Sequence, residues 1–338
     1  MRPLPLPPDL PTAFTFRQAR AAGVSEKQLR RADLAAPFRG VRIQDADPQT
    51  DERDKFVDPV IRAVQSLASA YALVMPPGAH LSHSTAAAHY KIPLPHRGFA
   101  QRNRWGLPFE ERVLIEAAVH RPGRAPRGAR IRGHETVAAL DPVILVGGIP
   151  MSTPAATWAS LASRLTLDEL VAVGDALVRI PRIPGPDGRV LHAPLATFDD
   201  LDAVIAAGRR VGIRTLREAR QLIRIGSASP QETKLRLALT TGTDLPAPTL
   251  DFDVYAAGVY LGCSEIAYPD YLVAVEYEGD QHRTERSQWV KDIDKYNAYA
   301  SAGWRVVQIT ADHLHETGEA PRRVRDALLQ AGWRPGTA

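Results

Sequence analysis

The sequence has 338 residues, of which 44% are hydrophobic and 24% charged, and its formal net charge is +4. This length is more typical of two or three domains than of one, and the composition argues against general disorder. No apolar run approaches the roughly 20 residues that span a bilayer, and the proline-rich start lacks a signal peptide's apolar core. We therefore expect a cytoplasmic protein with no membrane partner. The single Cys263 excludes an internal disulfide and a cysteine-based zinc finger.

The first 50 residues predict a small helical module followed by a strand. Helical spacing begins at Phe14 and ends at Gly23. A second helix follows, because Ser25 and Gln28 have the spacing of a capping box. Residues 38–43 alternate as a strand does. The order helix, turn, helix, β-wing is that of a winged helix.

This module is basic: residues 17–42 contain seven basic and two acidic side chains, a net charge of about +5. Through Phe16-x-x-x-x-Ala21-x-Gly23-Val24 and Arg39-Gly40-Val41 it resembles the N-terminal DNA-binding domain of the abortive-infection type IV antitoxin (AbiEi) family, over about 40 residues. The resemblance implies that the second helix enters a DNA groove and that the wing meets phosphates. The implied DNA-binding residues are Lys27, Gln28, Arg30, Arg31, Arg39 and Arg42. The alternatives are a solvated basic surface or a helical docking module.

Residues 51–228 carry little recognisable chemistry. They alternate between strand-like and helix-like pieces, which predicts a mixed α/β connector of unknown role. His80, His83 and His89 suggest a metal site, but no nearby carboxylate completes a ligand set in the sequence. We therefore interpret these histidines as hydrogen-bonded or exposed side chains.

Residues 229–338 have a legible pattern, and we expect them to form a domain of their own. The expected order is α-β-β-β-α-β, which makes the whole chain a mixed α/β (α+β) protein. The expected elements are a helix at 231–240, strands near 250–255, 259–267 and 272–278, a helix at 285–302 and a strand at 304–310.

Two carboxylates, Glu276 and Glu278, project from one face of the third strand because strand side chains alternate. Their charges, about 7 Å apart, favour a bound divalent cation, Mg²⁺ first and Mn²⁺ second. We expect Glu276→Gln to relieve this repulsion and to leave the fold intact or steadier without metal. A favourable register would bring Glu265 beside Glu276. A solvated sheet edge, or ligands from Asp251 and Asp253, are the alternatives.

The stretch from Glu265 to His282 combines an acid, an apolar strand, the motif Glu276-Tyr277-Glu278-Gly279 and a histidine. With Tyr296-Asn297 and Gly303-Trp304-Arg305-Val306 further along, it resembles the very-short-patch-repair-endonuclease-like branch of the PD-(D/E)xK nucleases, over roughly residues 229–315. The resemblance implies a restriction-endonuclease-like core that hydrolyses phosphodiester bonds.

In this resemblance Glu265 takes the place of the first acid, Glu276 that of the second, and Glu278 the position that other members fill with lysine. The first acid is Glu where Asp is usual, and the missing lysine removes the cation that orients water. Candidates to replace that lysine are His282, Lys291 and Lys295. Of these, His282 is also a candidate to move a proton or hold the phosphate.

Glu232 is a further candidate carboxylate, because nuclease folds of this type often carry one on a helix. Its competing interpretation is a capping box with Ser229 at the start of that helix.

The sequence thus predicts a Mg²⁺- or Mn²⁺-dependent endonuclease that acts on DNA, with duplex DNA as its partner. A homodimer is expected if both strands are cut, and the AbiEi resemblance suggests a protein partner from a defence or toxin–antitoxin system. The alternative function is a DNA-binding transcriptional regulator, similar to an antitoxin, whose nuclease-like domain is inactive.

Overall fold

The computed structural model describes residues 5–44, 58–99, 113–279 and 286–336, with the side chains of residues 286–291 excepted. It is a mixed α/β protein with three sheets, as expected. The chain divides into two compact units, one of residues 1–164 with 203–210 and one of residues 165–202 with 211–338. Among the described residues, no helix is both long and apolar enough to cross a bilayer.

The N-terminal part of the first unit is a helical pair beside a small sheet of order β1-β3-β2. Its elements are β1 (Ala13–Thr15), α1 (Phe16–Ala21), α2 (Glu26–Leu29), β2 (Leu34–Ala35) and β3 (Val41–Gln44). The expected helix start at Phe14 is wrong, because Phe14 lies in β1 with its side chain fully buried and Thr15 caps α1. The capping box of Ser25 and Gln28 is confirmed.

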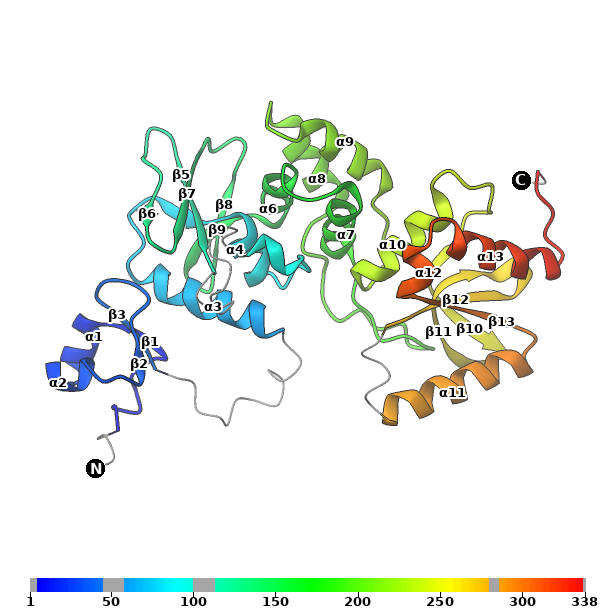
Figure 1. Cartoon of the computed structure of the whole chain (residues 1–338), viewed down its shortest axis with the longest axis horizontal. Helices are drawn as coiled ribbons and strands as arrows, with labels where there is room; N and C mark the ends of the chain where they lie inside the picture. Colours follow the sequence, from blue (N-terminus) through cyan, green and yellow to red (C-terminus); the bar gives the residue numbers. More distant parts are fainter. Residues whose placement is uncertain (1–4, 45–57, 100–112, 280–285, 337–338) are drawn as a thin grey trace. The chain divides into compact units, whose positions relative to one another are not determined.

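The rest of the first unit is a six-stranded sheet of order β6-β7-β5-β4-β9-β8 with helices (Figure 1). Its strands are β4 (Ala79–Leu81), β5 (Ile115–His120), β6 (Arg127–Gly128), β7 (Ile131–Thr136), β8 (Val143–Val146) and β9 (Ile149–Ser152). Its helices are α3 (Pro59–Ala72), α4 (His83–His89), the short η2 (His96–Gly98) and α6 (Pro154–Leu161). One core joins Val64 of α3 and Ala88 of α4 to Leu81, Ile115 and Ala117 of the sheet.

The second unit begins with helices that precede its sheet. These are α7 (Leu167–Val178), α9 (Ile213–Leu222) and α10 (Pro230–Thr240), while α8 (Phe198–Ala206) crosses the boundary between the units. A buried ion pair links α7 to α10, since Arg236 Nη2 lies 2.7 Å from Asp175 Oδ2. Asp175 also accepts hydrogen bonds from the Thr233 hydroxyl and the Arg224 amide. The charge of Asp175 therefore ties the two helices together.

The sheet of the second unit has the order β10-β11-β12-β13 (Figure 1). The elements from α10 onward are β10 (Thr249–Ala256), β11 (Val259–Tyr268), η3 (Pro269–Tyr271), β12 (Val273–Glu278), α11 (Arg286–Ser301), β13 (Arg305–Thr310), α12 (Ala311–His315) and α13 (Glu319–Gln330). The expected α-β-β-β-α-β order from α10 to β13 is confirmed. Tyr299 of α11 packs with Ala274 on one face of the sheet, while Leu235 of α10 and Val324 of α13 pack with Val275 on the other.

Candidate active site

The register between β11 and β12 is the one that the carboxylate hypothesis needs. The two strands are antiparallel, with Ile266 opposite Val275 and Ala267 opposite Ala274. Continuing this register by one residue places Glu265 opposite Glu276. The Tyr277 amide then donates a 2.8 Å hydrogen bond to Oε2 of Glu265.

Glu276 lies at the centre of the site, with its side chain only 5% exposed. Lys295 from α11 places its Nζ 3.0 Å from Oε2 of Glu276. Oε1 is buried and has no hydrogen-bond partner in the described part of the chain, since the nearby Ser264 hydroxyl donates to the Ile266 carbonyl instead. Burial raises the pKa of Glu276, and the charge of Lys295 opposes that shift. One oxygen of Glu276 is thus paired with Lys295, and the other is buried beside Ser264, whose hydroxyl also stabilises the carboxylate.

Glu265 is a second carboxyl with a raised pKa. Its burial, together with the charges of Glu232 and Glu276, raises its pKa to about 8. Such a shift is expected where several acids share one poorly solvated place. Glu232 of α10, Glu265 of β11 and Glu276 of β12 are therefore close enough for their charges to interact.

Glu232 lies in the first turn of α10 and acts electrostatically on Glu265. Its amide bonds the Ser229 hydroxyl, and its own Oε2 accepts a 2.7 Å hydrogen bond from the Ala228 amide. Burial raises the pKa of Glu232, and Asp251 adds to the shift. Ser229 therefore caps α10, but the full capping box is not formed, because the Glu232 carboxylate bonds the Ala228 amide and not the Ser229 amide.

Glu278 has a different environment, because its neighbours are hydrogen-bond donors. The Tyr296 hydroxyl and the Gln308 amide donate to its Oε1 over 2.7 and 3.0 Å. The side chain is half-buried and held in place. Where PD-(D/E)xK nucleases usually have lysine, this chain therefore has Glu278, and two hydrogen bonds hold its side chain in place.

Lys295 approaches the sheet closely because Gly262 has no side chain. Gly262 has φ of +150°, and a Cβ on it would lie 3.1 Å from Lys295 Cγ and 3.2 Å from the Tyr299 hydroxyl. This close packing of α11 on β11 brings the lysine to Glu276. Of the three candidates to replace the missing lysine, Lys295 is placed at the site. His282 and the side chain of Lys291 lie outside the described residues.

Asp251 and Asp253, the alternative metal ligands, both form ion pairs with an arginine. Arg182, from the loop after α7, donates to Oδ2 of both carboxylates over 2.6 Å. The sequence gives no sign of this contact, because Arg182 lies about 70 residues away in the chain. A metal ion bound by Asp251 and Asp253 would therefore have to displace Arg182 from its ion pairs with both carboxylates.

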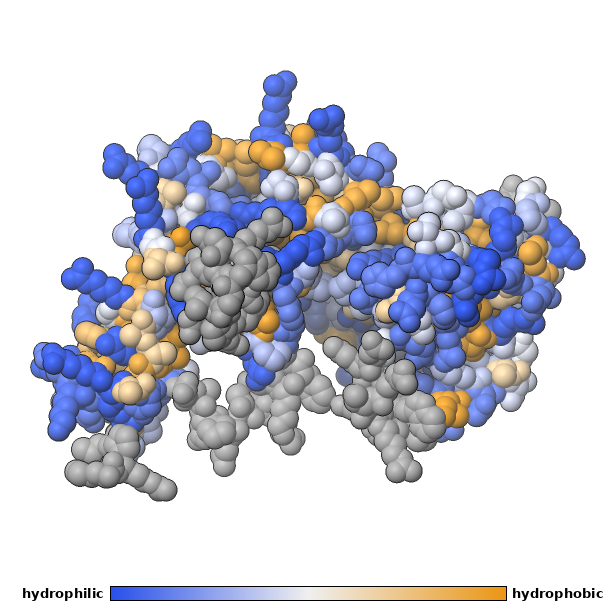
Figure 2. Space-filling view, in the orientation of Figure 1, coloured by the Kyte–Doolittle hydropathy of each residue, from blue (hydrophilic) through white to orange (hydrophobic). Residues whose placement is uncertain are grey.

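The residues expected to bind DNA divide into two groups. Lys27, Arg30 and Arg39 are exposed, and Figure 2 shows a largely hydrophilic surface over α2. Arg30 also lies 3.7 Å from Glu26, in a pair that is exposed on both sides.

The other three have structural partners. The Gln28 side chain closes the capping box of α2. Arg31 is held by Asp33 at 2.5 Å, and the Asp33 hydrogen bond raises the pKa of Arg31. Arg42 donates to the Leu29 carbonyl and stacks on Phe16. These contacts shape the module, so the exposed group is better placed to reach phosphates.

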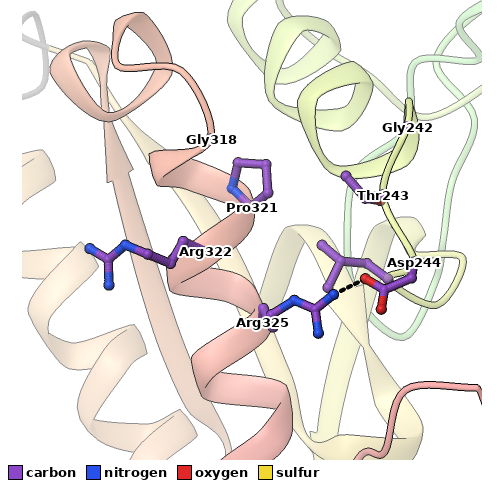
Figure 3. A pocket seen from close by; sticks show the side chains of 8 residues that line it. Gly242, Thr243, Asp244, Gly318, Pro321, Arg322 and Arg325 are labelled. Carbon is purple, nitrogen blue, oxygen red and sulfur yellow. Dashed lines mark hydrogen bonds and ion pairs between the residues drawn. The ribbon is translucent and has the colours of Figure 1, made fainter.

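A surface hollow lies in the second unit, between the loop after α10 and helix α13 (Figure 3). Arg325 and Asp244 form an ion pair across it. Its described lining residues are Gly242, Thr243, Asp244, Leu245, Gly318, Pro321, Arg322 and Arg325. No candidate carboxylate is among them, so the hollow and the carboxylate cluster are separate features.

The chain is similar to two curated proteins of Mycobacterium tuberculosis. These are "Uncharacterized protein Rv2248" of strain ATCC 25618 / H37Rv and "Uncharacterized protein MT2308" of strain CDC 1551 / Oshkosh, each 25% identical over 187 residues. The match covers 55% of this chain and 64% of each relative, so it spans less than two thirds of their length. No family model and no solved structure matches the chain. Function must therefore be argued from the site.

Proposed function

We propose that the protein is a metal-dependent endonuclease that hydrolyses phosphodiester bonds in DNA. The observation that carries this proposal is the grouping of Glu232, Glu265 and Glu276, whose pKa values are all raised, with Glu276 paired to Lys295 among the described residues. Gathering acids in a poorly solvated place costs free energy, and such clusters are typical of functional sites. Among the described residues, the charges of Lys295 and Arg179 oppose these shifts without cancelling them.

The carboxylate oxygens suit a hard divalent cation by type. However, no three of these side chains bring ligand atoms within 4.8 Å of one another in the described chain, so binding would require the side chains to move. Carboxylate oxygens are the ligands that Mg²⁺ and Mn²⁺ prefer, and the buried Oε1 of Glu276 has no other partner in the described chain. Glu265, Glu276 and Glu278 would hold the ion, which when bound polarises a phosphate and lowers the pKa of a water ligand. Lys295 would orient that water or stabilise charge on the phosphate, and Glu232 would fix the neighbouring backbone through the Ala228 amide.

The N-terminal module would supply DNA binding. Its exposed Lys27, Arg30 and Arg39 are suited to phosphate contacts, which contribute affinity without sequence readout. Duplex DNA is the partner that a winged helix implies. A cytoplasmic location agrees with such a substrate, and a homodimer would supply a second site for the second strand. A partner from a defence or toxin–antitoxin system stays part of the proposal.

One observation favours a second function. Glu278 is fixed by Tyr296 and Gln308 where other nucleases of this type have lysine. If Lys295 does not replace that lysine, the domain is inactive, and the protein is a DNA-binding regulator similar to an antitoxin.

The test is cleavage of supercoiled plasmid and of single-stranded and duplex oligonucleotides with Mg²⁺ or Mn²⁺. The wild type should cut, Glu276→Ala should not, and Glu316→Gln, which changes an exposed acid in the same unit, should cut as the wild type does. Binding of duplex DNA without cutting by the wild type would refute the endonuclease and support the regulator. Cutting by Glu276→Ala would refute this site.

A further inference from the structure

The six-stranded sheet of the first unit has one apolar and one polar face. Leu81, Ala117 and Ile115 point into the hydrophobic core. His80 lies opposite Ala118 across β4 and β5, and residues opposite each other or two apart in a strand share a face. His80 and His120 therefore share the polar face, where their ring centroids are 5.0 Å apart.

A first buried acid on this sheet is fully compensated. Glu116, only 1% exposed, accepts hydrogen bonds from the Ser84 amide and hydroxyl through Oε2. Its Oε1 lies 3.2 Å from His134 Nε2 and 2.5 Å from Arg164 Nη1. These donors lower the pKa of Glu116 in spite of its burial. Both carboxylate oxygens of Glu116 thus have hydrogen-bond or ion-pair partners, as expected for a buried acid with a structural role.

The second buried acid, Asp141, is paired with a histidine. His80 Nε2 lies 2.9 Å from its Oδ2, and their side chains are only 2% and 10% exposed. The Ser152 hydroxyl lies beside the carboxylate and stabilises its charge, although neither that hydroxyl nor Oδ1 makes a hydrogen bond of good geometry in the described chain. Arg210 interacts with Asp141 electrostatically, but its Nη2 donates to backbone carbonyls.

His120 completes the group. Its Nε2 lies 2.8 Å from the Asp141 carbonyl oxygen, a contact that orients the ring. One ligand atom from each of His80, His120 and Asp141 lies within 4.8 Å of the others. The 2.9 Å between His80 and Asp141 is within a few tenths of an ångström of the spacing of two ligands about 2.0–2.1 Å from one zinc ion.

We propose that His80, His120 and Asp141 bind a transition-metal ion of the Zn²⁺ class. Two imidazole nitrogens and one carboxylate oxygen are a ligand set for zinc and its neighbours rather than for Mg²⁺. Three protein ligands leave a coordination position for water or a ligand atom. The site is separate from the carboxylate cluster and does not rest on the nuclease proposal.

The test uses Co²⁺ as a spectroscopic substitute for Zn²⁺ on the full chain after treatment with a chelator. The wild type should bind one Co²⁺ with visible ligand-field bands, which Zn²⁺ displaces and excess Mg²⁺ does not. Glu276→Gln should keep the bands, which would show that the carboxylate cluster is not their source. Bands that vanish in Glu276→Gln, or a wild type with none, would overturn the proposal.

Variants of the ligands complete the test. His120→Gln, a change at the half-buried ligand, should weaken Co²⁺ binding at least tenfold, whereas His192→Gln, at an exposed histidine, should not. Circular dichroism checks that each variant is folded. If His120→Gln is unfolded, Asp141→Asn takes its place with the same expectation. Equal Co²⁺ affinity in a folded ligand variant and the wild type would refute the assignment.

Discussion

Replacing Glu265 with glutamine should stabilise the protein in metal-free buffer above pH 8. Folding raises the pKa of Glu265 from an ordinary 4.5 to about 8. Since each pKa unit corresponds to about 1.4 kcal/mol, the ionised side chain costs up to roughly 5 kcal/mol. Glutamine keeps an oxygen for the Tyr277 amide but adds a donor that needs a partner. We therefore expect the free energy of unfolding to rise by about 2–4 kcal/mol.

The pH dependence of this gain is specific. A carboxyl whose pKa is raised on folding keeps its proton in the native state and loses it in the unfolded state between about pH 4.5 and 8. The stability that Glu265 contributes is complete below this window and is lost as the pH rises through it. The variant should thus match the wild type near pH 4.5 and exceed it increasingly up to pH 8.

Urea unfolding with a chelator, at a series of pH values, measures this difference. The exposed control Glu316→Gln should change the free energy of unfolding by less than about 0.5 kcal/mol at each pH. Saturating Mg²⁺ should reverse the order, because a bound cation stabilises the ionised wild type. A variant that is less stable than the wild type at pH 8 without metal would refute the assignment of Glu265 as an uncompensated acid.

Three further predictions concern other contacts. Lys295→Met should lower the single-turnover cleavage rate at least a hundredfold and leave DNA affinity unchanged, as expected for a charge that acts at the reacting phosphate. An unchanged cleavage rate would show that Lys295 has no part in the mechanism. Lys27→Ala with Arg30→Ala should reduce the slope of log affinity against log salt by about 2, measured by fluorescence anisotropy, and an unaltered slope would count against the winged-helix interface. Arg236→Met should cost about 3–5 kcal/mol in urea unfolding because it leaves Asp175 buried without its cation, and a loss below 1 kcal/mol would contradict that account.

Local patterns in the sequence were sufficient for the elements from α10 to β13, but not for α12 and α13. Strand alternation placed Glu276 on one face, whereas its pairing with Glu265 depended on a register that only the structure gives. The effect of neutralising Glu276 was harder to predict. The sequence suggested relief of repulsion with Glu278, whereas Glu276 is paired to Lys295 and Glu278 to neutral donors. Such pairing depends on how α11 packs, which local spacing does not specify.

The polar face of the first unit was missed for a related reason. His80 was examined beside its neighbours in sequence, but its partners His120 and Asp141 are 40 and 61 residues away. Short strands with long-range pairing give weak periodic signals, and their sheet order cannot be read from them. The alternation of Glu116, Ala118 and His120 was the one local sign of a polar face.

The contacts of Arg182 and Asp175 have a consequence for whether residues 229–338 fold alone. Both residues precede position 229, where a domain boundary was expected, and both are bound to acids or bases beyond it. A fragment that starts at residue 229 would keep Asp251 and Arg236 but lose their counterions. We therefore expect the smallest autonomous fragment to begin near Leu165, where the second compact unit starts, so that helix and sheet unfold in one cooperative step.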